Sequence, residues 1–206
     1  MKMNNRWNRF IYHLWAPIYD STVGHFFAHG RRRAMQIIDL QPGERLLLVG
    51  VGTGPDLPLL PQGVEAVGID LSPAMLRRAR ARLPLPGRDV TLIQGDAQQL
   101  LVDEGSFDAV LFNLILSVIP DGAACLRENL RALKPGGRAV IFDKFLPDEG
   151  RLSLGRRLLN LGSTLFGTDI TRRFSDLVEG CRITILGNEP SLLRGAYRII
   201  KLETHR

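Results

Sequence analysis

The chain has 206 residues, of which 45% are hydrophobic, so it can bury the core of one domain. Lys and Arg outnumber Asp and Glu by 27 to 21, for a net charge of +6 at pH 7, which favours an anionic partner such as a membrane surface or a nucleic acid. Two distant cysteines, Cys125 and Cys181, exclude a disulfide framework and a zinc site, so no metal is expected. Because no stretch reaches the roughly 18 uncharged apolar residues of a membrane span and no signal peptide is recognisable, we expect a cytoplasmic chain.

An amphipathic helix is predicted over residues 7–18. Apolar residues fall on one face of this helix and basic residues flank them; the apolar ones are Trp7, Phe10, Ile11, Leu14, Trp15 and Ile18. Tryptophan prefers the headgroup level of a bilayer, and basic side chains attract anionic lipid. We therefore expect residues 2–18 to bind an anionic membrane surface. The alternative is a lid helix that packs on the protein's own core, and the two roles are compatible.

From residue 44 onward, short apolar runs alternate with segments of helical length. This pattern is typical of βαβ units and a parallel sheet covered on both faces. Strands are expected at 45–49, 65–69, 89–94, 107–113 and 137–143. Helices are expected at 73–83, which follows a Ser72 cap, and at 121–133, which begins on a capping residue. Runs at 181–186 and 196–202 predict a terminal antiparallel pair. The expected fold is α/β, with a doubly wound, seven-stranded, mostly parallel sheet.

A glycine turn follows the first of these strands. Segment 46–54, LLLVGVGTG, opens from an apolar strand into glycines, and the next strand ends on Asp70, about 20 residues after Gly50. Such a turn lets backbone N–H groups approach a ligand, while the acidic side chain accepts hydrogen bonds from ribose hydroxyls. Pro55 stands where a dinucleotide-binding motif would place its third glycine. The pattern therefore favours a nucleoside cofactor other than a dinucleotide.

The turn resembles motif I of the Rossmann-like S-adenosylmethionine-dependent methyltransferases. Segments 68–76, 95–97, 105–110 and 133–137 match the same enzymes in the same order, so the resemblance covers roughly residues 46–143. It implies a Rossmann-like fold, methyltransferase activity and S-adenosylmethionine as the cofactor. One position departs from the family: Leu48 stands where these enzymes usually carry Asp or Glu. That departure leaves a catalytically weak protein that binds S-adenosylmethionine as an alternative.

The resemblance implies roles for residues at the nucleoside end of the cofactor. Asp70 would hold the ribose. Leu71 and Met75 would line the adenine. Asp96 would accept a hydrogen bond from the adenine amino group, and Ala97 would donate its backbone N–H beside it.

Other residues are expected at the methionine end. Gly50, Gly52 and Gly54 would pack against the methionine portion. Asn113 would lie beside it and face the methyl group, as a cofactor-binding and catalytic residue. Tyr19, the second expected catalytic residue, would close over the cofactor and orient or deprotonate the acceptor.

The N-terminal segment narrows the resemblance. Residues 6–24, including WAPIYD at 15–20, are similar to the opening of soluble bacterial phosphatidylethanolamine N-methyltransferases and, more distantly, of quinone C-methyltransferases. The implied reaction is N-methylation of phosphatidylethanolamine or its methylated forms at a membrane surface. A quinone or another hydrophobic small molecule is the alternative acceptor. No nucleic-acid partner is expected, because no known binding module is recognisable.

One domain is expected over residues 1–206. Within it, residues 1–43 would form a helical lid or membrane helix, and 44–143 would form the cofactor-binding core. Residues 144–206 would hold a substrate-binding insertion and the terminal strands. The segment after residue 143 resembles the family least.

Overall fold

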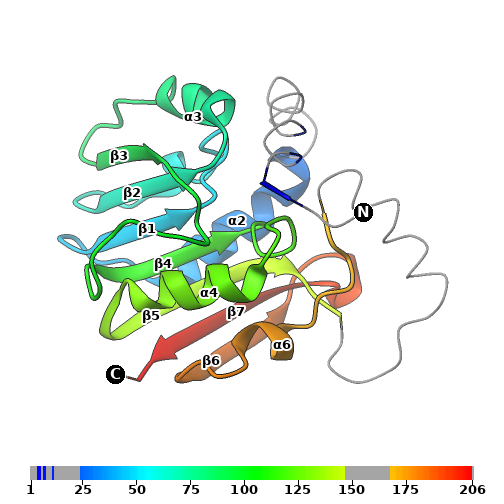
Figure 1. Cartoon of the computed structure of the whole chain (residues 1–206). Coiled ribbons are helices and arrows are strands. Elements are labelled where there is room, and N and C mark those ends of the chain that lie inside the picture. The colour runs from blue at the N-terminus through cyan, green and yellow to red at the C-terminus, as the bar shows by residue number, and fades with distance from the viewer. Residues whose placement is uncertain (1–3, 6, 8–10, 12–23, 147–167, 206) are drawn as a thin grey trace.

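The computed structural model describes residues 4, 5, 7, 11, 24–146 and 168–205. Within them, seven strands form one sheet in the order β3-β2-β1-β4-β5-β7-β6 (Figure 1). Their bounds are β1 Arg45–Val49, β2 Glu65–Asp70, β3 Asp89–Gln94, β4 Phe107–Asn113, β5 Leu133–Lys144, β6 Ile183–Pro190 and β7 Tyr197–Thr204. Strands β1 to β5 pair in parallel, and β7 runs antiparallel to β5 and β6. The predicted α/β fold with a C-terminal antiparallel pair is confirmed.

The strand bounds differ from the prediction mainly near the C-terminus. β1, β3 and β4 have the predicted limits. β5 begins at Leu133 rather than 137, because Leu133 pairs with Phe107 before the register shifts to Arg138 opposite Ala109. β6 and β7 begin later than predicted and extend further, because their pairing continues to Pro190 and Thr204.

Helices cover both faces of the sheet. They are α2 His25–Ile38, α3 Pro73–Arg80, α4 Gly122–Arg131 and α6 Phe174–Val178, with short 3-10 turns η2 Leu57–Leu59 and η3 Leu193–Gly195. The side chains of Ser72 and Asp121 accept backbone N–H groups and cap α3 and α4 as predicted. Of the predicted helix 7–18, Trp7 and Ile11 lie within the described residues, and both are helical. Across the described part of the chain, no helix is long and apolar enough to cross a bilayer.

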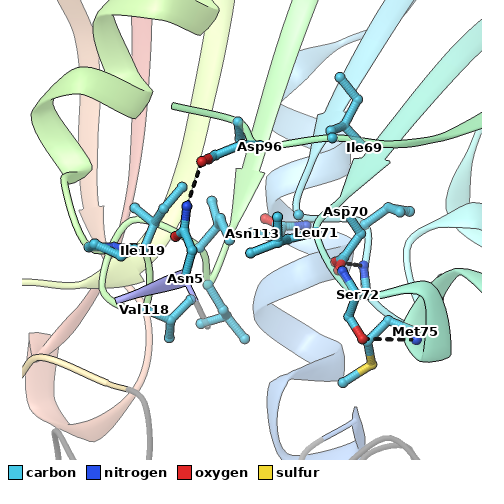
Figure 2. A pocket seen from close by; sticks show the side chains of 18 of the residues that line it. Asn5, Ile69, Asp70, Leu71, Ser72, Met75, Asp96, Asn113, Val118 and Ile119 are labelled. Atoms are coloured by element: carbon cyan, nitrogen blue, oxygen red, sulfur yellow. Dashed lines mark hydrogen bonds between the residues drawn. The ribbon is translucent and has the colours of Figure 1, made fainter. Parts of the chain in front are cut away.

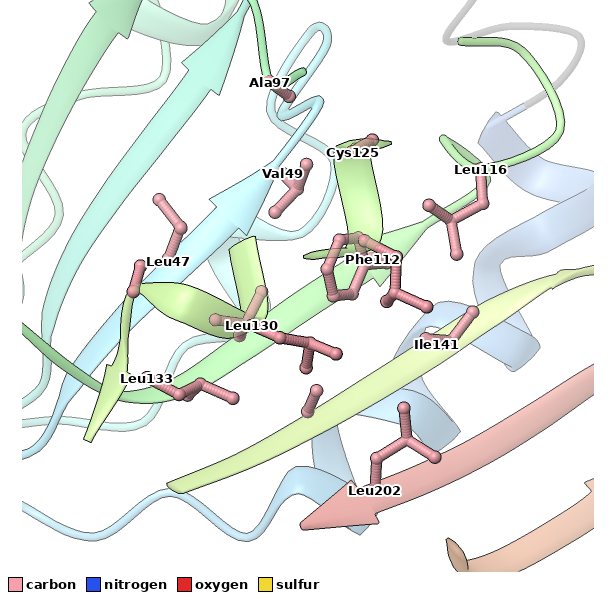
Figure 3. Packing of buried hydrophobic residues seen from close by; sticks show 14 of the residues in the cluster. Leu47, Val49, Ala97, Phe112, Leu116, Cys125, Leu130, Leu133, Ile141 and Leu202 are labelled. Atoms are coloured by element: carbon pink, nitrogen blue, oxygen red, sulfur yellow. The ribbon is translucent and has the colours of Figure 1, made fainter. Parts of the chain in front are cut away.

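The sheet separates two apolar clusters. Leu47 and Val49 of β1 pack in the cluster under α4 (Figure 3). Leu46 and Leu48 point the other way and pack in a cluster with residues of α2 and α3. The central strands β1, β2 and β4 are therefore buried on both faces, which leaves the carboxyl ends of the parallel strands as the edge where loops can form a site. The chain turns from β1 to β2 on one side and returns to β4 on the other, so this edge contains the topological switch point at which ligands bind.

Candidate functional site

A pocket opens at the carboxyl ends of β1, β2, β3 and β4 (Figure 2). The predicted residues that line it are Gly50, Gly52, Asp70, Leu71, Met75, Asp96, Ala97 and Asn113. α2 contributes Arg31, and the N-terminal segment contributes Asn5. Tyr19 lies outside the described residues. The sheet thus brings together side chains from four strand ends that are distant in the sequence.

The glycine turn has a backbone that other residues adopt poorly. Gly50 and Gly52 have φ of +67° and +59°, in the left-handed region that favours glycine. A Cβ on Gly50 would also come within 2.6 Å of Ile115. Gly54 does not line the pocket that the described residues form; a Cβ there would lie 3.2 Å from Ala79 of α3. Gly54 therefore lets the turn pack closely on α3, whereas Gly50 and Gly52 face the pocket.

Asp70 is held in place by the backbone on both sides. The Gly52 N–H donates to its Oδ2 at 2.8 Å, and the Ser72 N–H donates to its Oδ1 at 2.8 Å. Burial raises the pKa of Asp70 to about 6, against the opposing effect of these two donors. The carboxylate is therefore fixed in orientation and still has lone pairs available for ligand hydroxyls.

Asp96 has amide partners from two parts of the chain. Gln98 donates to it through its backbone N–H at 3.0 Å and through its side-chain amide. Asn5 donates from its Nδ2 to Oδ2 at 2.5 Å, as Figure 2 shows. Next to Asp96, the Ala97 carbonyl accepts a hydrogen bond at 2.8 Å from the buried Asn129 of α4. The contact with Asn5 was not predicted, because 91 residues separate it from Asp96.

A second buried carboxylate lies beside the pocket. Asp56, directly after the turn, accepts hydrogen bonds from Arg31 Nη1 at 2.7 Å and from Asn113 Nδ2 at 2.9 Å. Leu48 is buried in the apolar cluster on the α2 side of the sheet. The sequence did not predict a place at the site for Asp56 or Arg31. For Asp56, the available signal was an acidic residue shortly after a glycine turn.

The loop after β4 forms an apolar wall of the pocket. Its lining residues include Leu114, Ile115, Val118 and Ile119. The buried carboxylate of Asp143 accepts the N–H of Ser117 at 3.0 Å and so fixes the loop. Among the described residues, no group of three or more His, Cys, Asp and Glu side chains could hold a metal ion.

Comparison with known proteins identifies the family. Residues 47–141 match the model of a methyltransferase domain family. Over 194 residues, 93% of this chain and 95% of the relative, the chain is 30% identical to a phosphatidylethanolamine N-methyltransferase of Cereibacter sphaeroides. The chain belongs to the S-adenosylmethionine-dependent methyltransferases. The methyltransferase uses S-adenosylmethionine as its cofactor.

Further similarities differ in how much of the methyltransferase they cover. A demethylmenaquinone methyltransferase of Beutenbergia cavernae is 36% identical over 118 residues, which are 57% of this chain and 48% of that relative. A chain in the complex between the Haloferax volcanii Trm112 methyltransferase activator and a methyltransferase has a TM-score of 0.78 at 18% identity. That superposition covers 95% of this chain and 98% of the other, so the two share a fold.

The chemistry of the pocket fits S-adenosylmethionine. The glycine turn leaves space at Gly52, where an added Cβ would meet only the Gly50 carbonyl oxygen at 3.9 Å, and Asp70 offers fixed acceptors at the end of β2. Asn113 Oδ1 is buried and has no hydrogen-bond donor among the described residues. A ligand that carries both ribose hydroxyls and an ammonium group would satisfy these acceptors.

Proposed function

We propose that the methyltransferase methylates the amino group of phosphatidylethanolamine or of its partly methylated forms, as a cytoplasmic protein peripheral to the membrane. The extent of similarity carries this proposal. The match to the phosphatidylethanolamine N-methyltransferase spans 93% of the chain, far beyond the matched domain at 47–141. The match to the demethylmenaquinone methyltransferase spans 57%. Regions outside the shared core are where relatives with different acceptors are expected to differ.

The proposed nucleoside site lies at the ends of β2 and β3. Asp70 accepts hydrogen bonds from the ribose hydroxyls, and its fixed orientation supports this role. Asp96 accepts a hydrogen bond from the adenine amino group, and Ala97 donates its backbone N–H to the adenine beside it. Leu71 and Met75, both in the pocket lining, contact the faces of the adenine.

The proposed methionine site lies at the glycine turn and the end of β4. Gly50 and Gly52 allow the methionine portion to approach the backbone, while Gly54 keeps the turn close to α3. Asn113 binds the methionine portion near the reactive methyl group. Tyr19 closes over the cofactor and orients the acceptor amine, so Tyr19→Phe should lower kcat and leave the Kd for S-adenosylmethionine unchanged.

The proposed chemistry relies on positioning. When bound, S-adenosylmethionine supplies a methyl group already activated by its sulfonium. The chain therefore needs to hold the acceptor in line with that methyl group and to exclude water, and no covalent intermediate with a side chain is required. The acceptor ammonium must first lose one proton to solvent or to a base, so that its lone pair can attack the methyl group as the bond from carbon to sulfur breaks. The apolar wall formed by Leu114, Ile115, Val118 and Ile119 suits the exclusion of water and the approach of a hydrophobic acceptor.

A labelling experiment tests the acceptor. Purified protein is incubated with S-adenosylmethionine carrying a labelled methyl group and with vesicles that contain phosphatidylethanolamine and a demethylated quinone kept chemically reduced in its hydroquinone form. Label is expected in the phospholipid headgroup. Asp70→Ala serves as the inactive control, and Asp89→Ala, which alters an exposed residue at the start of β3, as the active one. Label only in the quinone would overturn the proposal.

A quinone is the second candidate acceptor. The observation that favours it is the 36% identity to the demethylmenaquinone methyltransferase. The electron-rich ring of the reduced, hydroquinone form is the nucleophile in that reaction, and it attacks most readily when a ring hydroxyl group has lost its proton. Product analysis with the quinone kept reduced therefore separates the two acceptors.

A further inference from the structure

Three residues from separate elements form one buried polar network beside the pocket. Asp56 follows the glycine turn, Arg31 lies on α2, and Asn113 is the last residue of β4. The side chains of Arg31 and Asp56 are only 6% and 5% exposed, and the Arg31 Nη1 to Asp56 Oδ2 distance is 2.7 Å. We call these residues the Asp56 network. Arg31 and Asn113 both line the pocket.

Asp56 fixes the orientation of the Asn113 amide. An ionised carboxylate only accepts hydrogen bonds, so the Asn113 group that faces Asp56 at 2.9 Å must be the Nδ2 donor. The amide oxygen then points away from Asp56. This Oδ1 is buried and has no hydrogen-bond donor among the described residues. Because a buried acceptor without a donor is unfavourable, a bound ligand is expected to supply one.

The position of this acceptor indicates which part of the cofactor it meets. Asp70 and Asp96 follow β2 and β3, on one side of β1, whereas Asn113 ends β4 on the other side. The donors that S-adenosylmethionine offers away from its nucleoside are those of the α-ammonium group. The Arg31 guanidinium next to Asn113 matches the α-carboxylate by charge.

We propose that Asp56 is a positioning residue that orients Asn113 and Arg31 to bind the amino acid end of S-adenosylmethionine. On the side of the sheet that α2 covers, Leu48 has only an apolar side chain. Asp56, which binds Arg31 of α2, supplies a carboxylate there. The inference rests on the proposed placement of the cofactor and is independent of the proposed acceptor.

Two ligands that differ only at the amino acid end provide the test. S-adenosylhomocysteine carries the α-amino and α-carboxylate groups, whereas 5′-methylthioadenosine keeps the nucleoside and lacks both. In Asp56→Asn, one amide hydrogen must face Arg31 or Asn113, so the network loses its alignment. Isothermal titration calorimetry should show about a tenfold or greater loss of affinity for S-adenosylhomocysteine and little change for 5′-methylthioadenosine.

Asn113→Ala is the second variant, because it leaves the Arg31–Asp56 ion pair intact if Asp56→Asn does not fold. It should show the same selective loss. Asp70→Ala should weaken both ligands, which reports on the nucleoside site. Equal weakening of both ligands by Asn113→Ala, or no weakening of either, would overturn the inference. The titrations contain no lipid, so they stay informative if the proposed acceptor is wrong.

Discussion

At the scale of single residues, Asp70 is fixed by backbone hydrogen bonds and is proposed to bind the ribose. Its oxygens already accept the N–H groups of Gly52 and Ser72 at 2.8 Å. Asp70→Ala removes the proposed charged acceptor for the ribose, so the affinity for S-adenosylhomocysteine should fall by about 1.5 to 3 kcal/mol, measured by calorimetry. Asp89→Ala, which removes an exposed carboxylate at the start of β3, is the matched control and should bind like the wild type. Unchanged binding by Asp70→Ala would contradict the ribose role.

If Asp70 binds the ribose as proposed, its raised pKa should make cofactor binding depend on pH. Burial raises this pKa to about 6, so the carboxyl group is protonated below this pH and ionised above it. Ribose hydroxyls donate to the ionised form, and affinity for S-adenosylhomocysteine should therefore rise from about pH 5 to about pH 7, by at most about tenfold per pH unit. Calorimetry across this range measures the slope. Asp70→Asn cannot titrate and should show a flat profile here; an equal slope in that variant would assign the effect to another group.

Asn5 donates a hydrogen bond to Asp96, the carboxylate that is proposed to bind adenine. Its Nδ2 lies 2.5 Å from Asp96 Oδ2, where the adenine amino group is proposed to donate, so we expect the cofactor to displace it. Asn5→Ala should therefore increase the affinity for S-adenosylhomocysteine, by about 1 kcal/mol or about fivefold in Kd. Gln99→Ala, an exposed amide on the neighbouring loop, should leave affinity unchanged. A weaker affinity in Asn5→Ala would mean that Asn5 contacts the cofactor instead of competing with it.

At the scale of elements, α2 approaches the sheet through a glycine. A Cβ on Gly30 would lie within 2.6 Å of the Phe142 ring carbons Cε1 and Cε2, and Phe142 is fully buried. Gly30→Ala should therefore lower the free energy of unfolding by about 1 to 3 kcal/mol, despite the better helix propensity of alanine. Urea denaturation measures this change. Gly187→Ala in β6, where nothing lies within 4 Å of the added Cβ, should stay within about 0.5 kcal/mol of the wild type.

Local patterns predicted the central strands and the antiparallel C-terminal pair well, and the start of β5 poorly. The limits of β1, β3 and β4 follow from short apolar runs bounded by turn residues. At Leu133, the sequence Lys-Pro-Gly-Gly that follows predicted a turn after a helix. The structure instead pairs Leu133 with Phe107 and then shifts register. That choice depends on a strand 26 residues away, which local periodicity does not report.

The candidate site also contains residues whose place in the pocket the sequence predicted and residues whose place it did not predict. Residues within a motif, such as Gly50 and Asp70, were predictable because strand ends and turns restrict where they can lie. The Asp56 network was not, because its hydrogen bonds join residues 25 and 57 positions apart on different elements. Only the packing of α2 on the sheet brings these side chains together, and no local pattern encodes their distance.

At the scale of the whole molecule, the two apolar clusters explain why one edge of the sheet carries the polar groups. The central strands β1, β2 and β4 bury both faces, so charged side chains near the pocket, such as Asp70 and Asp96, lie at the strand ends and in loops. The N-terminal segment reaches this edge, since Asn5 contacts Asp96 (Figure 2). Membrane attachment through residues 2–18 would therefore act next to the pocket.

The proposed membrane contact can be separated from a general effect of positive charge. Lys2, Arg6 and Arg9 flank the apolar stripe of the predicted helix 7–18, and each basic residue near an anionic surface contributes about 1 kcal/mol. Replacing all three by Gln should reduce sedimentation with anionic vesicles about tenfold or more, and deleting residues 1–15 should abolish it.

The exposed basic face of α3 provides the matched control. Arg77, Arg78 and Arg80 are exposed, so replacing them by Gln changes the net charge by the same amount at a different surface. This variant should sediment with anionic vesicles nearly as the wild type does, because its substitutions lie outside the segment proposed to contact the membrane. Equal loss in both triple variants would show that net charge alone drives binding. Unchanged sedimentation after deletion of residues 1–15 would assign that segment to a lid over the pocket and remove its role at the membrane.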